Sequence, residues 1–330
     1  MLARPALRDG FQSWEALSAA GLPDYLRAAG VIQEFEAIST SRSPGRNRVH
    51  RVCRSGKAHP SWFVKQFGFG DYDGAAFERE REVTTWPNSR LILSPVLVDD
   101  TWRVLVFPAF GESLYEMVRS GVAILPEIGS TLSRELRALQ AHAAATPLDL
   151  PPILRWLTGG SDDADLSIAQ RRLATTLRHN PSVKCVAERA SKVWRAGESQ
   201  SVLCHGDLKL EHVLVSVPRG ECRCVDWEFA RSGPAEWDFA GLLQSVLAHV
   251  VFDLITWSPD VRDLLVELLV DVDTESPEFA ALVALRLWQT AIEWETGQVQ
   301  LSNKSGPLCQ LGVNLACDPG QIDRLLRSGI

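Results

Sequence analysis

Residues 203–215 read LCHGDLKLEHVLV, and residues 224–229 read CVDWEF. Short apolar runs bracket the polar residues of this region, which predicts two short strands around a loop. Asp207 supplies a loop carboxylate that can orient a hydroxyl, while His212 and Asp226 are candidate metal ligands. Phosphoryl transfer requires few other protein groups, because it depends on positioning the acceptor and neutralising the phosphate charge. These residues therefore point to phosphoryl transfer at the rim of a strand pair.

The chain before residue 112 has mostly the pattern of strands. Residues 74–86 (GAAFEREREVTTW) are the exception and predict a helix that stops at Pro87. Near the N-terminus, residues 21–23 (GLP) are expected to break the helical residues 11–30. Alternating or apolar runs predict strands at residues 35–38, 49–53, 62–65, 91–98 and 102–107.

Beyond residue 112 the spacing of apolar residues becomes helical. One apolar stripe repeats at intervals of four and three and consists of Ile128, Leu132, Leu136 and Leu139. We therefore expect an N-terminal lobe at residues 1–107 that covers the nucleotide with a sheet and one helix. A hinge at 108–112 is expected to lead to a helical C-terminal lobe at 113–330, which carries the catalytic loop and the acceptor site.

The two quoted stretches resemble the aminoglycoside phosphotransferase family, a branch of the protein-kinase-like fold. That family shows HGD, then Asn five residues after the Asp, then a DxD or DxE motif after a strand; the protein-kinase motifs are distant relatives. The resemblance implies an α+β, two-lobed fold with a small β-rich N-lobe and a larger helical C-lobe. It implies that Asp207 is the catalytic carboxylate, Asp226 the principal Mg²⁺ ligand and Glu228 an accessory acid at the metal. A further family motif matches GPAEWDFA at 233–240, so Asp238 is expected to brace the catalytic loop.

His212 departs from the family pattern, because Asn is usual at this place. Mg²⁺ prefers oxygen ligands, and imidazole is a less natural partner for it. The macrolide phosphotransferase branch is similar to this chain in having His here. We therefore expect His212 to be a metal ligand in an active enzyme, and a non-catalytic pseudokinase is the alternative.

The N-terminal lobe has candidates for binding the nucleotide. Lys65 closes the strand-like run WFVK, where the resemblance places the lysine that contacts the α- and β-phosphates. Its expected partner is Glu80, on the inward face of the helix at 74–86, with Glu82 as the second choice. The remaining charges of FERERE, namely Glu78, Arg79 and Arg81, are interpreted as a solvated helix face.

Two further segments are candidates for contacts with the nucleotide. Residues 40–49 form a turn-like stretch in which backbone and hydroxyl donors of Ser43, Gly45 and Asn47 could cradle phosphate. An ordinary hairpin turn would explain the same residues. The stretch FPAFGES resembles the family hinge, and the expected adenine contacts there are Pro108, Ala109 and Phe110.

The acceptor is the least defined part of the sequence. Acidic residues at 161–165 and 260–275 could line a pocket for an amine-rich antibiotic, although solvated loops and helix faces explain them equally well. Three functions remain open. The first is a kinase that moves the γ-phosphate of ATP or GTP to a hydroxyl of an antibiotic or metabolite. The second is a peptide Ser/Thr kinase of class V lanthipeptide or thioamitide biosynthesis, and the third is a non-catalytic nucleotide-binding pseudokinase.

Composition narrows the partners and the location. The net charge is −7, and no run of Lys or Arg is present, which argues against nucleic acid as a partner. No apolar run approaches the ~20 residues of a membrane span. Seven scattered cysteines without a CxxC motif suit free thiols in a reducing compartment. The expectation is a cytoplasmic protein with a nucleotide triphosphate, Mg²⁺ and a hydroxyl acceptor as its partners.

Overall fold

The computed structural model divides into two compact units. The first consists of residues 1–111 together with 225–229, and the second consists of 112–224 together with 230–330. An antiparallel sheet dominates the first unit and helices dominate the second, which is the composition of an α+β protein. The residues that the structure describes are 17–34, 36–43, 48–57, 59–68, 70–86, 89–121, 126–141, 150–158, 166–196 and 201–328.

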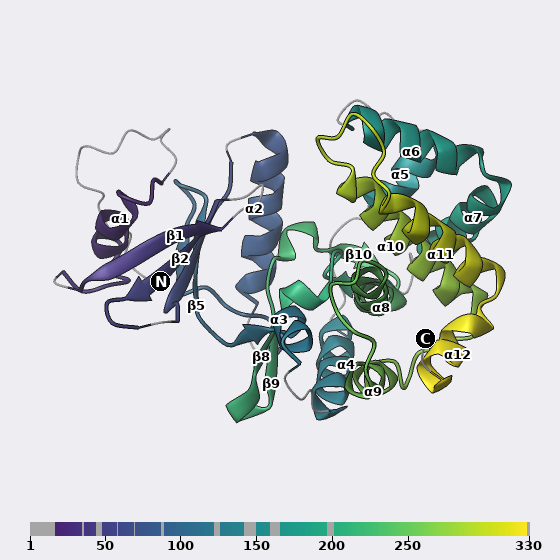
Figure 1. Cartoon of the computed structure of the whole chain (residues 1–330). Helices are drawn as coiled ribbons and strands as arrows, with labels where there is room; N and C mark the ends of the chain where they lie inside the picture. The colour runs from purple at the N-terminus through teal and green to yellow at the C-terminus, as the bar shows by residue number, and fades with distance from the viewer. Residues whose placement is uncertain are drawn as a thin grey trace. The chain divides into compact units, whose positions relative to one another are not determined.

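The first unit is built on a five-stranded antiparallel sheet in the order β1-β2-β3-β5-β4 (Figure 1). Alternate residues of the central strands, such as Val52, Val64 and Val106, are buried in its core. Trp62 of β3 pairs with Val52 of β2 and Pro108 of β5, which fixes the register around the hinge segment. The strands are β1 (Ile38–Ser43), β2 (Arg48–Arg54), β3 (Trp62–Gln66), β4 (Leu97–Asp99) and β5 (Val104–Pro108).

Three of the predicted elements of the first unit need correction. The strand predicted at 35–38 is wrong for most of its length, because β1 begins at Ile38 and residues 36 and 37 lie outside any strand, while residue 35 falls outside the described residues. The strand predicted at 91–98 is wrong for most of its length, because β4 is only Leu97–Asp99 and Leu91 and Leu93 are buried outside any strand. Pro95 lies within the predicted run and cannot donate to a ladder of hydrogen bonds. The break expected at 21–23 is wrong for Leu22 and Pro23, which begin α1 (Leu22–Ala28), since proline is tolerated in the first helical turn. Of the helical stretch predicted at 11–30, residues 11–16 fall outside the described residues and 17–21 are not helical.

The predicted helix at 74–86 is present as α2, which spans Asp71–Thr84. It begins three residues earlier than the apolar pattern suggests, because Gly70 is extended and Asp71 already has helical geometry. Phe77 of α2 packs edge-on against Phe67, just beyond β3, with ring centroids 5.5 Å apart. The helix is thereby anchored beside the strand that carries Lys65.

Helices make up most of the second unit, with two small sheets among them (Figure 1). β7 (Val202–Cys204) pairs with β10 (Arg231–Gly233), and β8 (Val213–Ser216) lies between β6 (Glu112–Ser113) and β9 (Glu221–Cys224). The strands on either side of the HGD loop, β7 and β8, therefore belong to different sheets and do not pair with each other. The helices are α3 (Leu114–Arg119), α4 (Pro126–Gln140), α5 (Pro152–Thr158), α6 (Ile168–His179), α7 (Pro181–Ala196), α8 (Glu236–Val251), α9 (Pro259–Leu268), α10 (Pro277–Trp294), α11 (Ser305–Cys317) and α12 (Gly320–Ser328).

The core of the second unit forms around α8 and α10, which pack against each other. Both helices are apolar on nearly every side, as expected for helices surrounded by protein. Trp288 of α10 is fully buried and donates its indole N–H to the Cys309 carbonyl at 3.1 Å, so it belongs to the core. None of the helices in the described ranges combines the length and hydropathy needed to cross a membrane.

Candidate active site

Lys65 of β3 lies in a cluster of three carboxylates within the first unit. Its ammonium group contacts Glu80 Oε2 at 2.5 Å and Glu228 Oε2 at 3.2 Å, and it also contacts Asp226 Oδ1. The side chains of Lys65 and Glu80 are only 7% and 1% exposed. One buried cation therefore faces three potential negative charges, which leaves a negative surplus at this cluster.

The local fold explains why these residues meet. Lys65 occupies a strand position next to the buried Val64, and Glu80 lies on the buried face of α2. Glu82 is exposed, so Glu80 is the glutamate that contacts Lys65. The interpretation of Arg79 as solvated is wrong, since its Nε donates to the Glu228 carbonyl at 2.7 Å and ties residues 225–229 to α2. Arg81 does lie at the surface, paired with Glu78 and Asp100.

The carboxylates of this cluster fit a hard divalent cation. Oxygen atoms of Glu80, Asp226 and Glu228 all lie within 4.8 Å of one another. Mg²⁺ takes oxygen ligands and tolerates few protein donors, because it keeps several waters. Asp226 has φ of +72°, a left-handed conformation that Asp adopts more readily than most residues. Strained backbone of this kind concentrates at functional sites.

The pKa values of the cluster reflect burial and charge. Burial acts to lower the pKa of Lys65, but the three carboxylates outweigh it and raise that pKa well above its ordinary value. Burial also raises the pKa of Glu80 to about 7, against the opposing pull of Lys65. Lys65 is therefore held as a cation.

Asp207 has the opposite surroundings within the second unit. Its Oδ1 accepts from Arg286 Nη2 at 2.8 Å, and its Oδ2 lies 3.0 Å from Lys209 Nζ. Lys209 in turn lies 3.6 Å from Glu293 of α10. Burial acts to raise the pKa of Asp207, but Lys209 and Arg286 outweigh it and hold that pKa well below its usual range. Asp207 is therefore an ionised carboxylate with a cation on each oxygen.

The backbone of the HGD loop is fixed from both sides. Asp238, in the first turn of α8, accepts from the N–H of His205 at 2.7 Å and from the N–H of Gly206 at 3.1 Å. Trp237 donates its indole N–H to the Gly206 carbonyl at 3.0 Å. Gly206 has φ of +84°, which favours glycine at this place. The expected bracing contact of Asp238 with the loop is confirmed.

His212 completes the HGD loop. Its Nδ1 lies 2.8 Å from the Asp207 carbonyl, which can only accept, so Nδ1 carries the hydrogen. In the neutral ring, the lone pair is then on Nε2, the tautomer that suits a metal ligand. The ring also stacks on His205 with centroids 5.6 Å apart. His212 is not among the three residues of the carboxylate group described above, and its role as a metal ligand stays a prediction.

The other predicted nucleotide contacts lie in the first unit or outside the described residues. Gly45 and Asn47 fall outside them, and Ser43 ends β1. In the hinge segment, Pro108 has no N–H and the N–H of Ala109 donates to the Ser61 carbonyl at 2.9 Å. A purine bound there would therefore have to form its hydrogen bonds with backbone carbonyl oxygens or with the backbone of Phe110. These nucleotide-binding roles stay predictions.

Sequence reasoning missed Arg286 and gave Lys209 no role, although both contact Asp207. Arg286 lies far along the chain from the loop, so no local motif includes it. One signal was available: it is a lone arginine in the apolar run 279–288 of α10. A buried arginine in such a helix requires a buried partner, because an unpaired charge in the core is costly.

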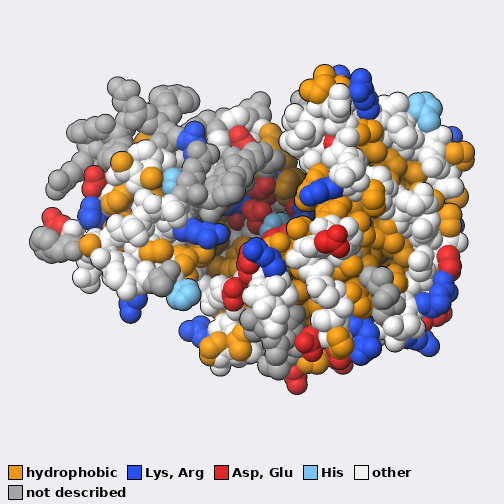
Figure 2. Space-filling model, viewed as in Figure 1, with side chains coloured by type: hydrophobic (Ala, Val, Ile, Leu, Met, Phe, Trp, Pro, Cys, Tyr) orange, Lys and Arg blue, Asp and Glu red, His pale blue; other side chains and the backbone are white. Residues whose placement is uncertain are grey.

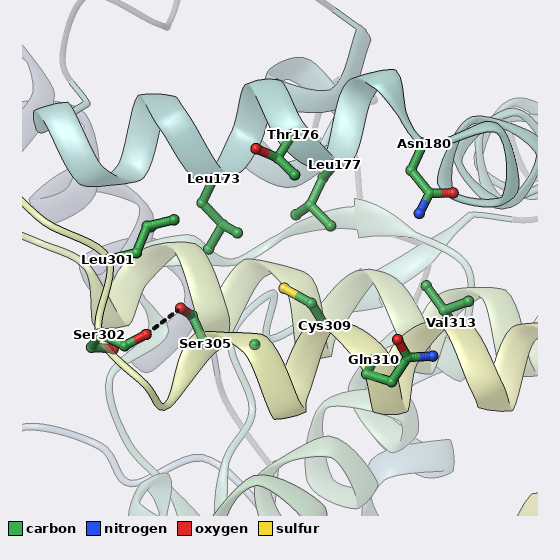
Figure 3. Close-up of a pocket in the computed structure, with 11 residues that line it drawn as sticks. Leu173, Thr176, Leu177, Asn180, Leu301, Ser302, Ser305, Cys309, Gln310 and Val313 are labelled. Atoms are coloured by element: carbon green, nitrogen blue, oxygen red, sulfur yellow. Dashed lines mark hydrogen bonds between the residues drawn. The ribbon is translucent and has the colours of Figure 1, made fainter.

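The second unit also has a cavity between α6 and α11 (Figure 3). Its volume is about 290 Å³, and Leu173, Leu177 and Leu301 give it an apolar lining. Figure 3 shows the thiol of Cys309 on the side of α11 that faces α6. Burial raises the pKa of Cys309 to about 12, so the thiol stays protonated at neutral pH. No described lining residue is charged, which distinguishes this cavity from a site for an amine-rich acceptor.

A second pocket lies among α5, α6 and α7, with a volume of about 580 Å³. Its lining includes Lys184, Lys192 and Arg195 and only one described acid, Glu188. On the face of the second unit seen in Figure 2, Lys and Arg side chains lie among acidic and hydrophobic ones. The acidic residues 161–165 fall outside the described residues, and Asp260 and Glu275 are exposed, as expected of a solvated surface.

Residues 44–271, more than half of the chain, match the model of the phosphotransferase enzyme family (APH). The chain belongs to this family. The predicted family resemblance and the predicted enzyme class, a phosphotransferase of the kinase type, are thereby confirmed. No curated protein matches the sequence.

Several solved structures have the same fold and are distant in sequence. An ethanolamine kinase from Plasmodium vivax is 15% identical, with 95% of this chain and 91% of that chain covered and a TM-score of 0.58. A choline kinase from Cryptosporidium parvum is 11% identical, with coverage of 94% and 97% and a TM-score of 0.57. The GDP complex of wild-type aminoglycoside 2'-phosphotransferase-IIIa is 13% identical, with coverage of 93% and 100% and a TM-score of 0.57. The predicted kinase-like fold is confirmed.

Proposed function

We propose that this phosphotransferase moves the γ-phosphate of ATP or GTP to a hydroxyl group of a small molecule, such as an antibiotic or a metabolite. The observation that carries the proposal is the carboxylate cluster around Lys65, in which a buried cation is held by Glu80 beside Asp226 and Glu228. A nucleotide phosphotransferase needs a fixed cation for the phosphates and acids for a metal. This cluster supplies both.

Each residue has a distinct part in the proposed reaction. Lys65 binds the α- and β-phosphates, and Glu80 keeps its ammonium group in place. Asp226 and Glu228 would hold Mg²⁺, with His212 as a further ligand, and the ion would supply neutralisation of the phosphate charge. Asp207 orients the acceptor hydroxyl and receives its proton as the oxygen attacks phosphorus. Asp238 keeps the loop that carries Asp207 in position.

The similar structures support a small acceptor and a nucleotide. They are an ethanolamine kinase, a choline kinase and an aminoglycoside phosphotransferase, the last in complex with GDP. The choline kinase LicA from Streptococcus pneumoniae has been solved with AMP. Ethanolamine, choline and aminoglycosides all carry hydroxyl groups. We infer the same chemical class, an alcohol of low molecular mass, for this chain.

A coupled assay of nucleotide consumption tests the proposal. ATP and GTP are each supplied with Mg²⁺ and panels of hydroxylated antibiotics, amino alcohols and Ser- or Thr-containing peptides, and products are read by mass. We expect phosphorylation of a small alcohol by the wild type and a rate at least about 100-fold lower for Asp207→Asn. Phosphorylation of peptides alone would favour the peptide kinase. Nucleotide binding without transfer to any acceptor would contradict an active enzyme and favour the pseudokinase.

A further inference from the structure

Arg286 has surroundings that a merely structural arginine does not need. Its side chain is 1% exposed in the middle of α10, and its Nη2 donates to Asp207 Oδ1 at 2.8 Å. Its Nη1 lies 3.4 Å from the Gly206 carbonyl and 3.2 Å from Gln289 Oε1. The guanidinium carbon lies 5.3 Å from the ring centroid of Trp237. Arg286 thus contacts both the carboxylate and the backbone of the HGD loop.

We propose that Arg286 is a positioning residue for phosphoryl transfer, which holds Asp207 by Oδ1 so that Oδ2 receives the acceptor hydroxyl. The inference rests on the proposed function. In this assignment the hydroxyl O–H bond breaks and its proton passes to Oδ2. The hydroxyl oxygen bonds to the γ-phosphorus, and the bond from that phosphorus to the bridging oxygen breaks. The nucleoside diphosphate leaves with the electron pair of the broken bond.

The two oxygens of Asp207 differ in a way that supports this assignment. Oδ1 faces Arg286, which is buried, whereas Oδ2 faces Lys209, whose side chain is 23% exposed. A carboxylate oxygen has two lone pairs and can accept from a second donor beside Lys209. An acceptor from solvent therefore reaches Oδ2 more readily than Oδ1. The guanidinium of Arg286 is planar and cannot lose its proton, so it is suited to holding the other oxygen, Oδ1, in a fixed position.

Arg286 also fixes the peptide group that precedes Asp207. The Gly206 carbonyl accepts from Trp237 and faces Arg286, while the N–H of the same peptide, that of Asp207, donates to His205 Nδ1 at 3.4 Å. Both polar ends of this peptide are therefore held. Rotation of the peptide would swing the Asp207 carboxylate, so the same arginine restrains the loop and the group that it carries.

The fold makes room for this arrangement at Gly241 of α8. A Cβ at Gly241 would lie 2.6 Å from the Leu208 carbonyl and 3.3 Å from Arg286 Nε. Contacts below about 3.0 Å do not occur for real Cβ atoms, so a larger residue would displace the loop or the arginine. Glycine here thus permits the close approach of α8, the HGD loop and Arg286.

Steady-state kinetics of Arg286→Met and Arg286→Lys test the proposal. Misplacement of a reacting group by about 1 Å can cost 100-fold, so we expect Arg286→Met to lower kcat by about 100-fold. Arg286→Lys keeps the positive charge but loses the planar set of N–H donors of the guanidinium, and we expect a smaller loss in kcat of about 10-fold. The KM for the nucleotide is expected to change less than twofold in both, because Lys65 and its carboxylates are untouched.

Arg178→Met is the matched control. Arg178 is a half-buried arginine of the same unit whose guanidinium donates to the Trp156 carbonyl, and it makes no described contact with Asp207. Its loss should leave kcat within about twofold of the wild type, even if thermal stability falls. Circular dichroism identifies variants that do not fold. Should Arg286→Met fail to fold, Arg286→Lys decides, and unchanged kcat in that variant would overturn the proposal.

A double-mutant cycle with Asp207→Asn separates this proposal from the proposed function. If Arg286 acts through Asp207, adding Arg286→Met to Asp207→Asn lowers the residual single-turnover rate by less than about twofold. A further 100-fold loss would overturn the proposal, since Arg286 would then act without Asp207. Full activity of Asp207→Asn alone would refute the proposed function and this inference with it. Loss of activity in Asp207→Asn with unchanged kcat in Arg286→Met would refute only this inference.

Discussion

Lys65 and Asp207 are buried charges with opposite surroundings. Lys65 is one cation among three carboxylates, and Asp207 is one carboxylate between two cations. Each central charge is outnumbered by its partners, so burial does not neutralise it. Among direct contacts, the surplus is negative around Lys65 and positive around Asp207, where Glu293 lies on the far side of Lys209. The first suits a divalent cation, and the second suits a carboxylate that must stay ionised while it orients a neutral hydroxyl.

Buried ion pairs are weak evidence of stability, because the cost of removing charges from water offsets their attraction. The presence of two such clusters in one chain is therefore better explained by a role in catalysis than by a contribution to the stability of the fold. The two centres should therefore respond differently to mutation. Loss of Asp207 should lower turnover, and loss of Lys65 should lower stability as well as nucleotide binding.

The largest effect is expected for Asp207→Asn. The variant keeps the shape of the side chain but removes the base, and such a loss typically lowers the rate by 10²–10⁴-fold. Nucleotide affinity should remain close to the wild type, because the Lys65 cluster is intact. Initial rates and a nucleotide titration measure both quantities. Activity within about tenfold of the wild type would show that Asp207 is not the catalytic carboxylate.

Lys65→Met should lower the free energy of unfolding by about 3–5 kcal/mol, since it leaves buried carboxylates without their cation. Chemical denaturation measures this loss. The double variant Lys65→Met, Glu80→Gln should recover part of it, because the amide removes the unpaired charge. Strictly additive losses in the two single variants and the double variant would argue against a coupled pair.

Asp226→Asn should abolish the stabilisation of the protein by Mg²⁺ and nucleotide. A ligand that binds only the folded state at 100 times its Kd contributes about 2.7 kcal/mol. Thermal unfolding with and without Mg²⁺ and nucleotide reports this contribution. Glu78→Gln on the exposed side of α2 is the control and should respond to Mg²⁺ like the wild type. A normal Mg²⁺ response in Asp226→Asn would exclude that residue as the principal ligand.

The smallest effect is expected for Arg81→Ala, which breaks exposed pairs with Glu78 of the same helix and with Asp100. Exposed pairs of this spacing contribute about 0.3–0.5 kcal/mol. Denaturation of this variant, measured beside Lys65→Met, shows whether burial decides the difference. A loss above about 2 kcal/mol for Arg81→Ala would contradict that explanation.

Local pattern predicted much of the fold and some of the contacts. The contact of Lys65 with Glu80 was predictable because helical spacing places Glu80 on the buried face of α2. Asp238 was predictable because the HGD loop and the GPAEWDFA stretch match family motifs. Residues two apart in a strand face the same side of the sheet, and Cys222 and Cys224 are accordingly both buried in β9.

The remaining contacts depend on tertiary packing that no local pattern encodes. Arg286 reaches Asp207 from a helix that begins 70 residues after it, and Gly241 leaves room for the approach. Arg79 has the alternating charges of a surface helix, yet it donates to the Glu228 carbonyl. Leu91 and Leu93 read as strand residues, because burial alone does not distinguish a strand from a buried loop.

Residues 225–229 belong to the first unit, while the chain on either side of them belongs to the second. This connectivity limits what protein engineering can do with the molecule. A fragment that ends at residue 111 retains Lys65 and Glu80 but lacks Asp226 and Glu228, so its carboxylate cluster around Lys65 would be incomplete. Exchange of the first unit between family members would likewise require two grafts, the N-terminal segment and this five-residue insert.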